Sequence, residues 1–302
     1  HSTDRTGAIV GKLAESDRRL TLVNPPALPP GWLGKPHAVH NGSLGASSDY
    51  LLFIDADVRL LPTAVSQAVA LAESKHAGLT TLMPELVNDS FWECATQPVV
   101  GMLLWGLLDP VKVNDPNRGE ACGFGPFMLF RRDAYEQIGG HEAVRREVIE
   151  DLRLAQLVKQ HQLGLCVAHG TSVVKLRMYD SLSSLIAGWI KNFYIALGPV
   201  KALAPLLAAV VALVFALPTV AFWTALGLGL WHGKLPDFAL AATLCYGADW
   251  LARLSLQSTY DVHVRGVRAL GGLVVAYILC ASVYRAAVGR PVTWRGRSYQ
   301  AQ

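Results

Sequence analysis

The sequence is short of charged residues and of paired cysteines. Only 17% of its 302 residues are charged, whereas 52% are hydrophobic. The five cysteines, Cys94, Cys122, Cys166, Cys245 and Cys280, lie far apart and form no CxxC pair. This spacing argues against a disulfide framework and against a zinc site, so we expect buried free thiols in a reducing compartment.

The sequence also lacks a basic surface for nucleic acid. The net charge is only +4, and no basic stripe with interleaved aromatic residues is present. We therefore expect no nucleic-acid partner. The small basic excess suits an anionic membrane face or an anionic substrate.

The hydrophobic residues are unevenly distributed along the chain. Residues 1–180 have the composition of a soluble domain, whereas residues 202–286 are mostly Leu, Ala, Val and Gly. A membrane span needs about 20 apolar residues, and three transmembrane helices are predicted within residues 199–288: Ala202–Leu230, Leu235–Leu256 and Val267–Val283. Arginines flank the third span on both sides, so the topology and the side of the tail at residues 289–302 stay open.

Residues 181–198 are predicted to form an amphipathic helix immediately before these spans. Apolar side chains recur at helical spacing from Leu182 to Leu197, and Lys191 lies off this stripe. Such a helix suits the membrane interface. Packing of the same stripe on the soluble domain is the alternative.

Strands alternate with helices in residues 1–180. Helices are predicted at Ala64–Ser74 and Glu150–Gln160, among others, and strands at Leu20–Val23, Tyr50–Ile54, Gly78–Met83, Phe127–Phe130 and Cys166–Ala168. The apolar run Tyr50–Ile54 is typical of a strand buried on both faces. The pattern predicts an α/β fold with a mainly parallel sheet.

Two carboxylates, Asp55 and Asp57, directly follow the apolar run Tyr50–Ile54. Side chains two apart on an extended strand point the same way, and ligands of open α/β sheets bind beyond the carboxyl ends of the strands. Two acids placed there can hold Mg²⁺ or Mn²⁺, which in turn can hold a diphosphate. Acids that merely occupy a loop after a strand give the same pattern.

Two further motifs can carry chemistry. Glu150 and Asp151 begin a predicted helix, where acids favour the helix dipole and where one of them can also act as a general base. Gly123, Phe124 and Gly125 form a glycine-rich loop in which backbone can approach a ligand closely. Taken alone, this loop fits any tight turn.

In combination these motifs are more specific. The chain has an apolar strand with DxD, then GFGPFMLFRRDAYEQIGGH, then VIEDLRLAQLVKQHQLG. This order resembles the membrane-attached family 2 glycosyltransferases with a GT-A fold, including the cellulose synthase-like, ceramide glucosyltransferase-like and bacterial carotenoid- or hopanoid-associated branches. The resemblance covers nearly the whole chain, with PPGWLGKPHAVHNG near the start and VTWRGRSY after the last span.

The resemblance implies roles for individual residues. Asp57 would bind the metal on the nucleotide diphosphate with Asp55 nearby, and Asp151 would be the general base with Glu150 beside it. The other implied substrate-binding residues are Lys35 near the nucleotide, Gly123, Phe124 and Gly125 along the donor sugar and acceptor pocket, and His141 near the acceptor.

The sequence departs from this family in two places. Cellulose synthase-like members carry a QxxRW motif on an interfacial helix, and this chain has Gly188-Trp189-Ile190-Lys191-Asn192 at the corresponding place. Trp189 and Lys191 are therefore the substrate-binding candidates there. His1 to Thr6 resemble residues that follow a nucleotide-binding Asp-Asp in the family, so we expect the first strand of the domain to be missing.

The resemblance implies an inverting, metal-dependent transfer of sugar from a nucleotide sugar to a lipid-type acceptor. The enzyme would lie at a bacterial inner membrane with its catalytic domain in the cytoplasm. A carboxylate acceptor would need no base. The alternatives are a non-catalytic GT-A-like binding protein at the membrane and, more remotely, a transporter using Asp249 and Arg253.

Overall fold

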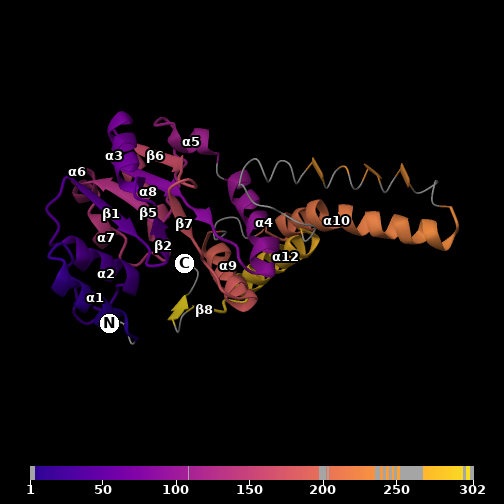
Figure 1. Ribbon diagram of the computed structural model, residues 1–302, viewed down its shortest axis with the longest axis horizontal. Coiled ribbons are helices and arrows are strands. Elements are labelled where there is room, and N and C mark those ends of the chain that lie inside the picture. Colours follow the sequence, from indigo (N-terminus) through magenta and orange to yellow (C-terminus); the bar gives the residue numbers. More distant parts are fainter. Residues whose placement is uncertain are drawn as a thin grey trace. The chain divides into compact units, whose positions relative to one another are not determined.

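The computed structural model describes residues 4–107, 109–196, 202, 204–234, 239–240, 243–244, 247, 250–251, 268–294 and 297–299. The chain divides into two units (Figure 1). The first comprises residues 1–56, 60–83 and 111–173, and the second comprises residues 57–59, 84–110 and 174–302.

The first unit alternates helices and strands. Its elements are α1 (Thr6–Ser16), α2 (Gly34–Ser43), β1 (Tyr50–Ile54), α3 (Ala64–Ser74), β3 (Leu79–Met83), α5 (Pro110–Asn114), β5 (Phe127–Arg131), α6 (Arg132–Gln137), α7 (Gly140–Ala143), α8 (Glu150–Gln160) and β6 (Leu165–His169). The predicted helices at 64–74 and 150–160 are confirmed with the same bounds.

The sheet of this unit has four strands in the order β1-β5-β3-β6. Strand β5 is antiparallel to both β1 and β3, whereas β3 and β6 are parallel. The prediction of a mainly parallel sheet is therefore wrong for the pairing, although β1, β3 and β6 share one direction. A strand buried on both faces has a continuous apolar sequence whichever way it runs, so Phe127–Phe130 did not disclose its direction.

Small side chains allow helix α3 to pack closely in the first unit. Ala64, Ala68 and Ala72 are buried, and their spacing of four residues places them on one face of the helix. Helix α8 buries Leu154, Ala155 and Val158 in the same periodic way. Leu154 and Phe130 are fully buried, so the core of this unit lies between its helices and the central strands.

Strand β1 lies at the edge of the four-stranded sheet, among the strands that the structure describes. Leu51 is the residue of β1 that is buried, and Ile54 is 48% exposed. The expectation that this strand is buried on both faces is therefore wrong. An apolar run reports that a segment avoids water on average, but it does not report its position within a sheet.

Residues 20–23 form no strand, contrary to the prediction. Leu20, Leu22 and Val23 are all exposed, and two prolines follow at positions 25 and 26. Proline cannot donate a backbone hydrogen bond to a sheet. The short apolar run therefore lacks both the burial and the continuation that a strand needs.

The second unit is mainly helical. Its elements are β2 (Val58–Leu60), β4 (Glu85–Leu86), α4 (Phe91–Leu107), β7 (Val174–Leu176), α9 (Leu182–Ala196), α10 (Ala204–Trp231), α12 (Arg268–Ala287), β8 (Val292–Trp294) and β9 (Arg297–Tyr299). Strands β2, β7 and β4 form one small sheet, and β8 pairs with β9 in another.

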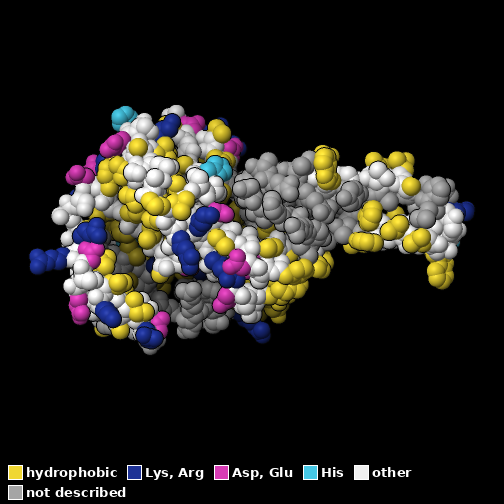
Figure 2. Space-filling model, in the orientation of Figure 1, with side chains coloured by type: hydrophobic (Ala, Val, Ile, Leu, Met, Phe, Trp, Pro, Cys, Tyr) yellow, Lys and Arg dark blue, Asp and Glu magenta, His cyan; other side chains and the backbone are white. Residues whose placement is uncertain are grey.

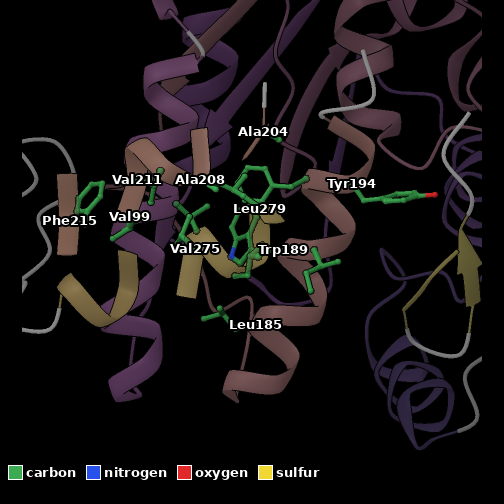
Figure 3. Close-up of a cluster of buried hydrophobic side chains, with 14 of the residues drawn as sticks. Val99, Leu185, Trp189, Tyr194, Ala204, Ala208, Val211, Phe215, Val275 and Leu279 are labelled. Atoms are coloured by element: carbon green, nitrogen blue, oxygen red, sulfur yellow. The ribbon is translucent and has the colours of Figure 1, made fainter. Parts of the chain in front are cut away.

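Helices α4, α9, α10 and α12 share one apolar core. Figure 3 shows side chains from these helices converging, among them Val99, Trp189, Phe215 and Leu279. The indole N–H of Trp189 donates to Gln97 Oε1 at 2.8 Å, which satisfies a polar group that packing has removed from water. The apolar side chains of α9 thus pack against other helices of the second unit. The predicted position of α9 at a membrane interface stays a prediction.

Helices α10 and α12 expose much apolar surface. Figure 2 shows hydrophobic side chains along these helices, and the exposed ones on α10 include Leu206, Leu213, Leu217, Trp223 and Trp231. Leu270–Ala287 is long and apolar enough to cross a membrane, and Ala204–Phe215 with Val220–Trp231 passes as one span bent by 46°.

The described residues thus hold one candidate span, or two when the bent pair is taken as one. Most of the predicted span Leu235–Leu256 lies outside the described residues. The expectation of three spans stays a prediction.

The close approach of α12 to α4 yields a stability prediction. A Cβ atom on Gly271 would overlap the backbone carbonyl oxygen of Ala95, whereas one on Gly227 of α10 would meet no atom of the described residues within 4 Å. Gly271→Ala should lower the thermal stability of the purified protein in detergent, because forced overpacking costs about 1–3 kcal/mol.

Gly227→Ala is the matched control. It should leave stability unchanged or raise it, since alanine is about 1 kcal/mol better than glycine within a helix. Equal melting temperatures for the two variants would contradict this packing.

Candidate active site

Three segments of the first unit bring charged side chains together. Lys35 is the second residue of α2, Asp55 follows β1, and Glu150 begins α8. The Lys35 Nζ atom lies 2.8 Å from Asp55 Oδ1 and 2.7 Å from Glu150 Oε1. One ammonium group therefore bridges two carboxylates that are 95 positions apart in the sequence.

Local sequence explains why these side chains lie where helices begin. Pro36 sits in the first turn of α2, where a helix has no intrahelical use for the N–H that proline lacks. Glu150 and Asp151 occupy the first turn of α8, where the helix dipole stabilises negative charge. The residues of the first turns thus explain why α2 and α8 begin at the site.

Asp151 is held by two backbone amides. Its Oδ2 atom accepts the Gly125 N–H at 2.8 Å, and its Oδ1 atom accepts the Leu152 N–H at 2.8 Å. These bonds fix the orientation of the carboxylate and stabilise its charged form. A base held in this way needs no reorientation before it accepts a proton.

The glycine loop fits closely around this carboxylate. A Cβ atom on Gly123 would overlap the Asp151 carbonyl, and one on Gly125 would lie 3.0 Å from Asp151 Oδ2 and 3.3 Å from Lys35 Nζ. Close approach to backbone requires glycine at position 123, whereas at position 125 an added Cβ would press on the two charged side chains. The loop thus lies beside Asp151 and Lys35, and its predicted role in lining the donor and acceptor pocket stays a prediction.

The side chain of Thr81 in β3 holds the same loop through hydrogen bonds. Its Oγ1 atom accepts the Phe124 N–H at 2.9 Å and donates to the Phe127 carbonyl at 3.0 Å. The side chain is fully buried. Phe124 is therefore held through its backbone, and its own side chain is half-buried.

Burial disfavours the charged forms of the carboxyl groups in this cluster, and the positive charge of Lys35 favours them. Burial, together with the charge of Asp151, raises the pKa of Glu150, and Lys35 opposes this. Burial likewise raises the pKa of Asp151, against the charge of Lys35 and the Gly125 N–H. Burial lowers the pKa of Lys35, but the nearby Glu150 and Asp55 outweigh it, and the net shift is upward.

His141 lies buried beside the aromatic side chains of Phe53 and Tyr135. Its Nδ1 atom is 2.8 Å from the Tyr135 hydroxyl oxygen, and its ring centroid is 4.8 Å from that of Phe53. Burial, followed by the charges of Lys35 and His40, lowers the pKa of His141 to about 4. The imidazole is therefore neutral at physiological pH.

The structure brings together most of the residues that the sequence singled out. Lys35, Asp55, Glu150, Asp151 and the loop Gly123–Gly125 meet in the first unit. Asp57 is exposed and begins a short segment that groups with the second unit. Trp189 and Lys191 also belong to the second unit, where Trp189 is a core residue, so their predicted contact with substrate stays a prediction.

The oxygen atoms at Asp55 and Asp57 are of the kind that Mg²⁺ and Mn²⁺ prefer. Asp57 has no ion pair among the described residues, and the ion pair of Asp55 uses Oδ1. Within the same residues, no group of three or more His, Cys, Asp or Glu side chains could hold a metal by itself. The predicted binding of a divalent cation by Asp57 and Asp55 stays a prediction.

Sequence reasoning missed two residues that shape the site. Thr81 fixes the glycine loop, and Tyr135 was noted within its motif but given no role. A hydroxyl residue inside the apolar strand Leu79–Met83 was the available indication for Thr81, because a buried hydroxyl needs a partner. Tyr135 gave no comparable indication, because its contact with His141 depends on the turn at Gly139 and Gly140.

An α/β unit that gathers acids, a lysine and a glycine loop beyond the end of a strand is suited to binding a polar ligand and to moving a proton. The family model for glycosyl transferase family 21 matches residues 29–302. The chain belongs to this family. The resemblance to family 2 glycosyltransferases of the carotenoid-associated branch is thereby confirmed.

The chain is similar to 4,4'-diaponeurosporenoate glycosyltransferases of Staphylococcus aureus. It is 30% identical over 181 residues to the protein of strain USA300, a region covering 56% of this chain and 46% of that protein. It is 29% identical over 178 residues to the protein of strain MRSA252, with the same coverage. The match thus spans about half the length of these curated relatives.

Two adjacent threonines of β3 provide a test of the loop anchor. Thr81→Val should destabilise the protein by about 1–3 kcal/mol, because the Phe124 N–H would lose its buried partner. Thr80 is equally buried, but its hydroxyl has no hydrogen-bond partner among the described residues.

Thr80→Val should therefore be neutral or stabilising, since valine has nearly the same shape as threonine and lacks the unsatisfied hydroxyl group. Chemical denaturation of both variants measures the difference. A Thr81→Val protein as stable as Thr80→Val would show that the loop does not depend on this hydroxyl.

Proposed function

We propose that this chain carries the catalytic domain of a glycosyltransferase that moves a sugar from a nucleotide-sugar donor to a lipid-type acceptor at a membrane. Membership of glycosyl transferase family 21 supports the reaction class. The observation that carries the proposal is the cluster of Lys35, Asp55, Glu150 and Asp151 against the glycine loop. This cluster brings together a carboxylate in a fixed orientation, the positive charge of Lys35 and a stretch of loop backbone without side chains.

The proposed reaction is a single displacement with inversion at the anomeric carbon. The acceptor oxygen forms the new bond to this carbon, and the nucleoside diphosphate leaves with the electrons of the broken bond. Asp151 takes the proton of a hydroxyl acceptor, a contribution typically worth ~10²–10⁴-fold in rate. The two amides that hold Asp151 favour this role, because they orient the carboxylate before the substrate binds.

A divalent cation belongs to the proposal as a partner of the donor. We expect Mg²⁺ or Mn²⁺ to be held through Asp57 with Asp55 nearby, and its charge would stabilise the departing diphosphate. Lys35 carries a positive charge in the same cluster and would lie near the nucleotide. The proposal is a GT-A-type domain in which a few acidic side chains share the cation with phosphate and water.

The acceptor is proposed to be lipid-like. The relatives named above act, by their name, on 4,4'-diaponeurosporenoate, and the ending of that word denotes a carboxylate. In this chain, the exposed apolar side chains of α10 and α12 support attachment to a membrane where such an acceptor dissolves. We propose three membrane spans, with the catalytic domain on the cytoplasmic side of a bacterial inner membrane.

The second candidate is a non-catalytic membrane protein that binds a nucleotide sugar. It is favoured by the ion pairs of Lys35, which occupy Asp55 and Glu150. The candidates differ in turnover. A panel of nucleotide sugars with Mn²⁺ and bacterial lipid extract, assayed with the natural polypeptide that contains this sequence, decides between them: labelled glycolipid supports the enzyme, and donor binding without product supports the binding protein.

Asp151→Asn tests the acceptor chemistry. With a hydroxyl acceptor, the variant should lose ~10²–10⁴-fold in rate because no base takes the proton. With a carboxylate acceptor, which carries no proton at neutral pH, activity should remain largely intact. Initial rates with matched alcohol and acid acceptors measure the contrast, and equal losses with both would argue that Asp151 serves binding instead.

Lys35→Met tests the electrostatic role of the bridging ammonium. Lys35 lowers the pKa of both Glu150 and Asp151, so its removal should raise both. A base must be deprotonated to act, and the rate with a hydroxyl acceptor should therefore begin to fall at a higher pH than in the wild type.

Lys35→Arg is the charge-conserving control for this prediction. It should keep the acid limb of the pH–rate profile near that of the wild type, since the positive charge remains. An unshifted acid limb in Lys35→Met would contradict the proposed coupling.

A further inference from the structure

The Tyr135 hydroxyl group makes two hydrogen bonds to the same residue. The backbone N–H of His141 donates to the hydroxyl oxygen at 3.0 Å, and the His141 Nδ1 atom lies 2.8 Å from that oxygen. Burial raises the pKa of Tyr135, so the phenol keeps its proton. The Ser43 Oγ atom also lies 3.5 Å from this oxygen, and the proton of Ser43 goes to the His40 carbonyl oxygen at 2.8 Å. The phenol proton therefore has two acceptors within reach, and the shorter contact, to Nδ1, favours donation there. The imidazole proton then resides on Nε2.

Packing holds the two rings in this arrangement. Phe53 lies edge-on to His141, with ring centroids 4.8 Å apart and planes at 67°. Gly140 adopts a positive φ of 52°, and a Cβ atom there would lie 2.7 Å from the Tyr135 ring. His141 is only 3% exposed. A rotation of the imidazole would therefore require several buried groups to move.

The ring lies beside the charged cluster of the same unit. Phe53 precedes Asp55 by two residues, and side chains at this spacing in an extended segment point the same way. Lys35 and His40 are close enough for their charges to lower the pKa of His141. Among the described residues Nε2 has no hydrogen-bond partner.

We propose that Tyr135 is a positioning residue that fixes His141 as the neutral Nε2–H tautomer, and that this N–H donates to an oxygen atom of the bound acceptor. The inference rests on the proposed glycosyl transfer and deepens it. A neutral donor recognises the lone pairs of a hydroxyl or carboxylate oxygen. It adds no positive charge beside Lys35, and a hydroxyl held in this way keeps its own proton directed elsewhere, toward a base.

Nuclear magnetic resonance tests the tautomer without any reaction. The full chain in detergent, labelled with ¹⁵N-histidine, should give a neutral Nε2–H pattern for His141 at pH 7, and His141→Gln identifies the signal by its loss. Tyr135→Phe keeps the ring but removes the hydroxyl, so it should produce a mixture of tautomers. Tyr50→Phe removes a β1 hydroxyl that makes no hydrogen bond to His141 and should leave the pattern unchanged.

Kinetics test the use of the N–H. Glutamine can place an amide N–H near the position of Nε2, whereas asparagine places one near Nδ1. His141→Gln should retain acceptor kcat/KM within a few-fold, and His141→Asn and Tyr135→Phe should lose roughly tenfold, the cost of one hydrogen bond. The KM for the nucleotide sugar should stay unchanged in all three variants.

Three results would overturn the inference. A cationic or Nδ1–H imidazole at pH 7 would exclude the proposed tautomer, and an unchanged pattern in Tyr135→Phe would exclude the role of Tyr135. A rise in donor KM with unchanged acceptor kinetics would assign the N–H to the donor sugar. A wild-type protein that transfers no sugar would refute the proposed function instead, and the spectrum would still decide the tautomer.

Discussion

The ammonium group of Lys35 is the interaction on which the candidate site depends. It lies within 2.8 Å of Asp55 and 2.7 Å of Glu150, and it thereby joins the start of α2, the end of β1 and the start of α8. Without it, Asp55, Glu150 and Asp151 would gather three negative charges in a partly dry environment. Like charges at short range and lost hydration both oppose ionisation, so this arrangement of the three segments requires the lysine.

Backbone groups stabilise the negative charge that Lys35 leaves uncompensated. Two N–H groups hold Asp151, and Gly125 can donate one of them because no side chain intervenes between the loop and the carboxylate. Thr81 then fixes the loop. Polar groups placed before a substrate arrives do not have to reorganise during the reaction, and this chain places them through glycine, a buried hydroxyl and the first turn of a helix.

The sequence predicted which residues form the site better than it predicted how the strands around them pair. Asp55, Glu150, Asp151 and the glycines were found because each belongs to a short motif at the boundary of an element, and Lys35 was found only through the resemblance to the family. The direction of β5 and the edge position of β1 were not found, since an apolar run reports burial and not pairing. Tyr135 remained without a role because its partner is reached through a turn in which Gly139 and Gly140 both have positive φ, a shape that the motif alone does not specify.

The edge position of β1 has a consequence for handling the protein. Among the strands that the structure describes, one side of β1 has no strand neighbour, and Ile54 at the end of β1 is exposed. Such an edge is a template on which an extended segment of another molecule can add. A strand of the natural polypeptide that paired with β1 would cover this edge, whereas detergent, which shields the apolar helices, does not shield backbone polar groups.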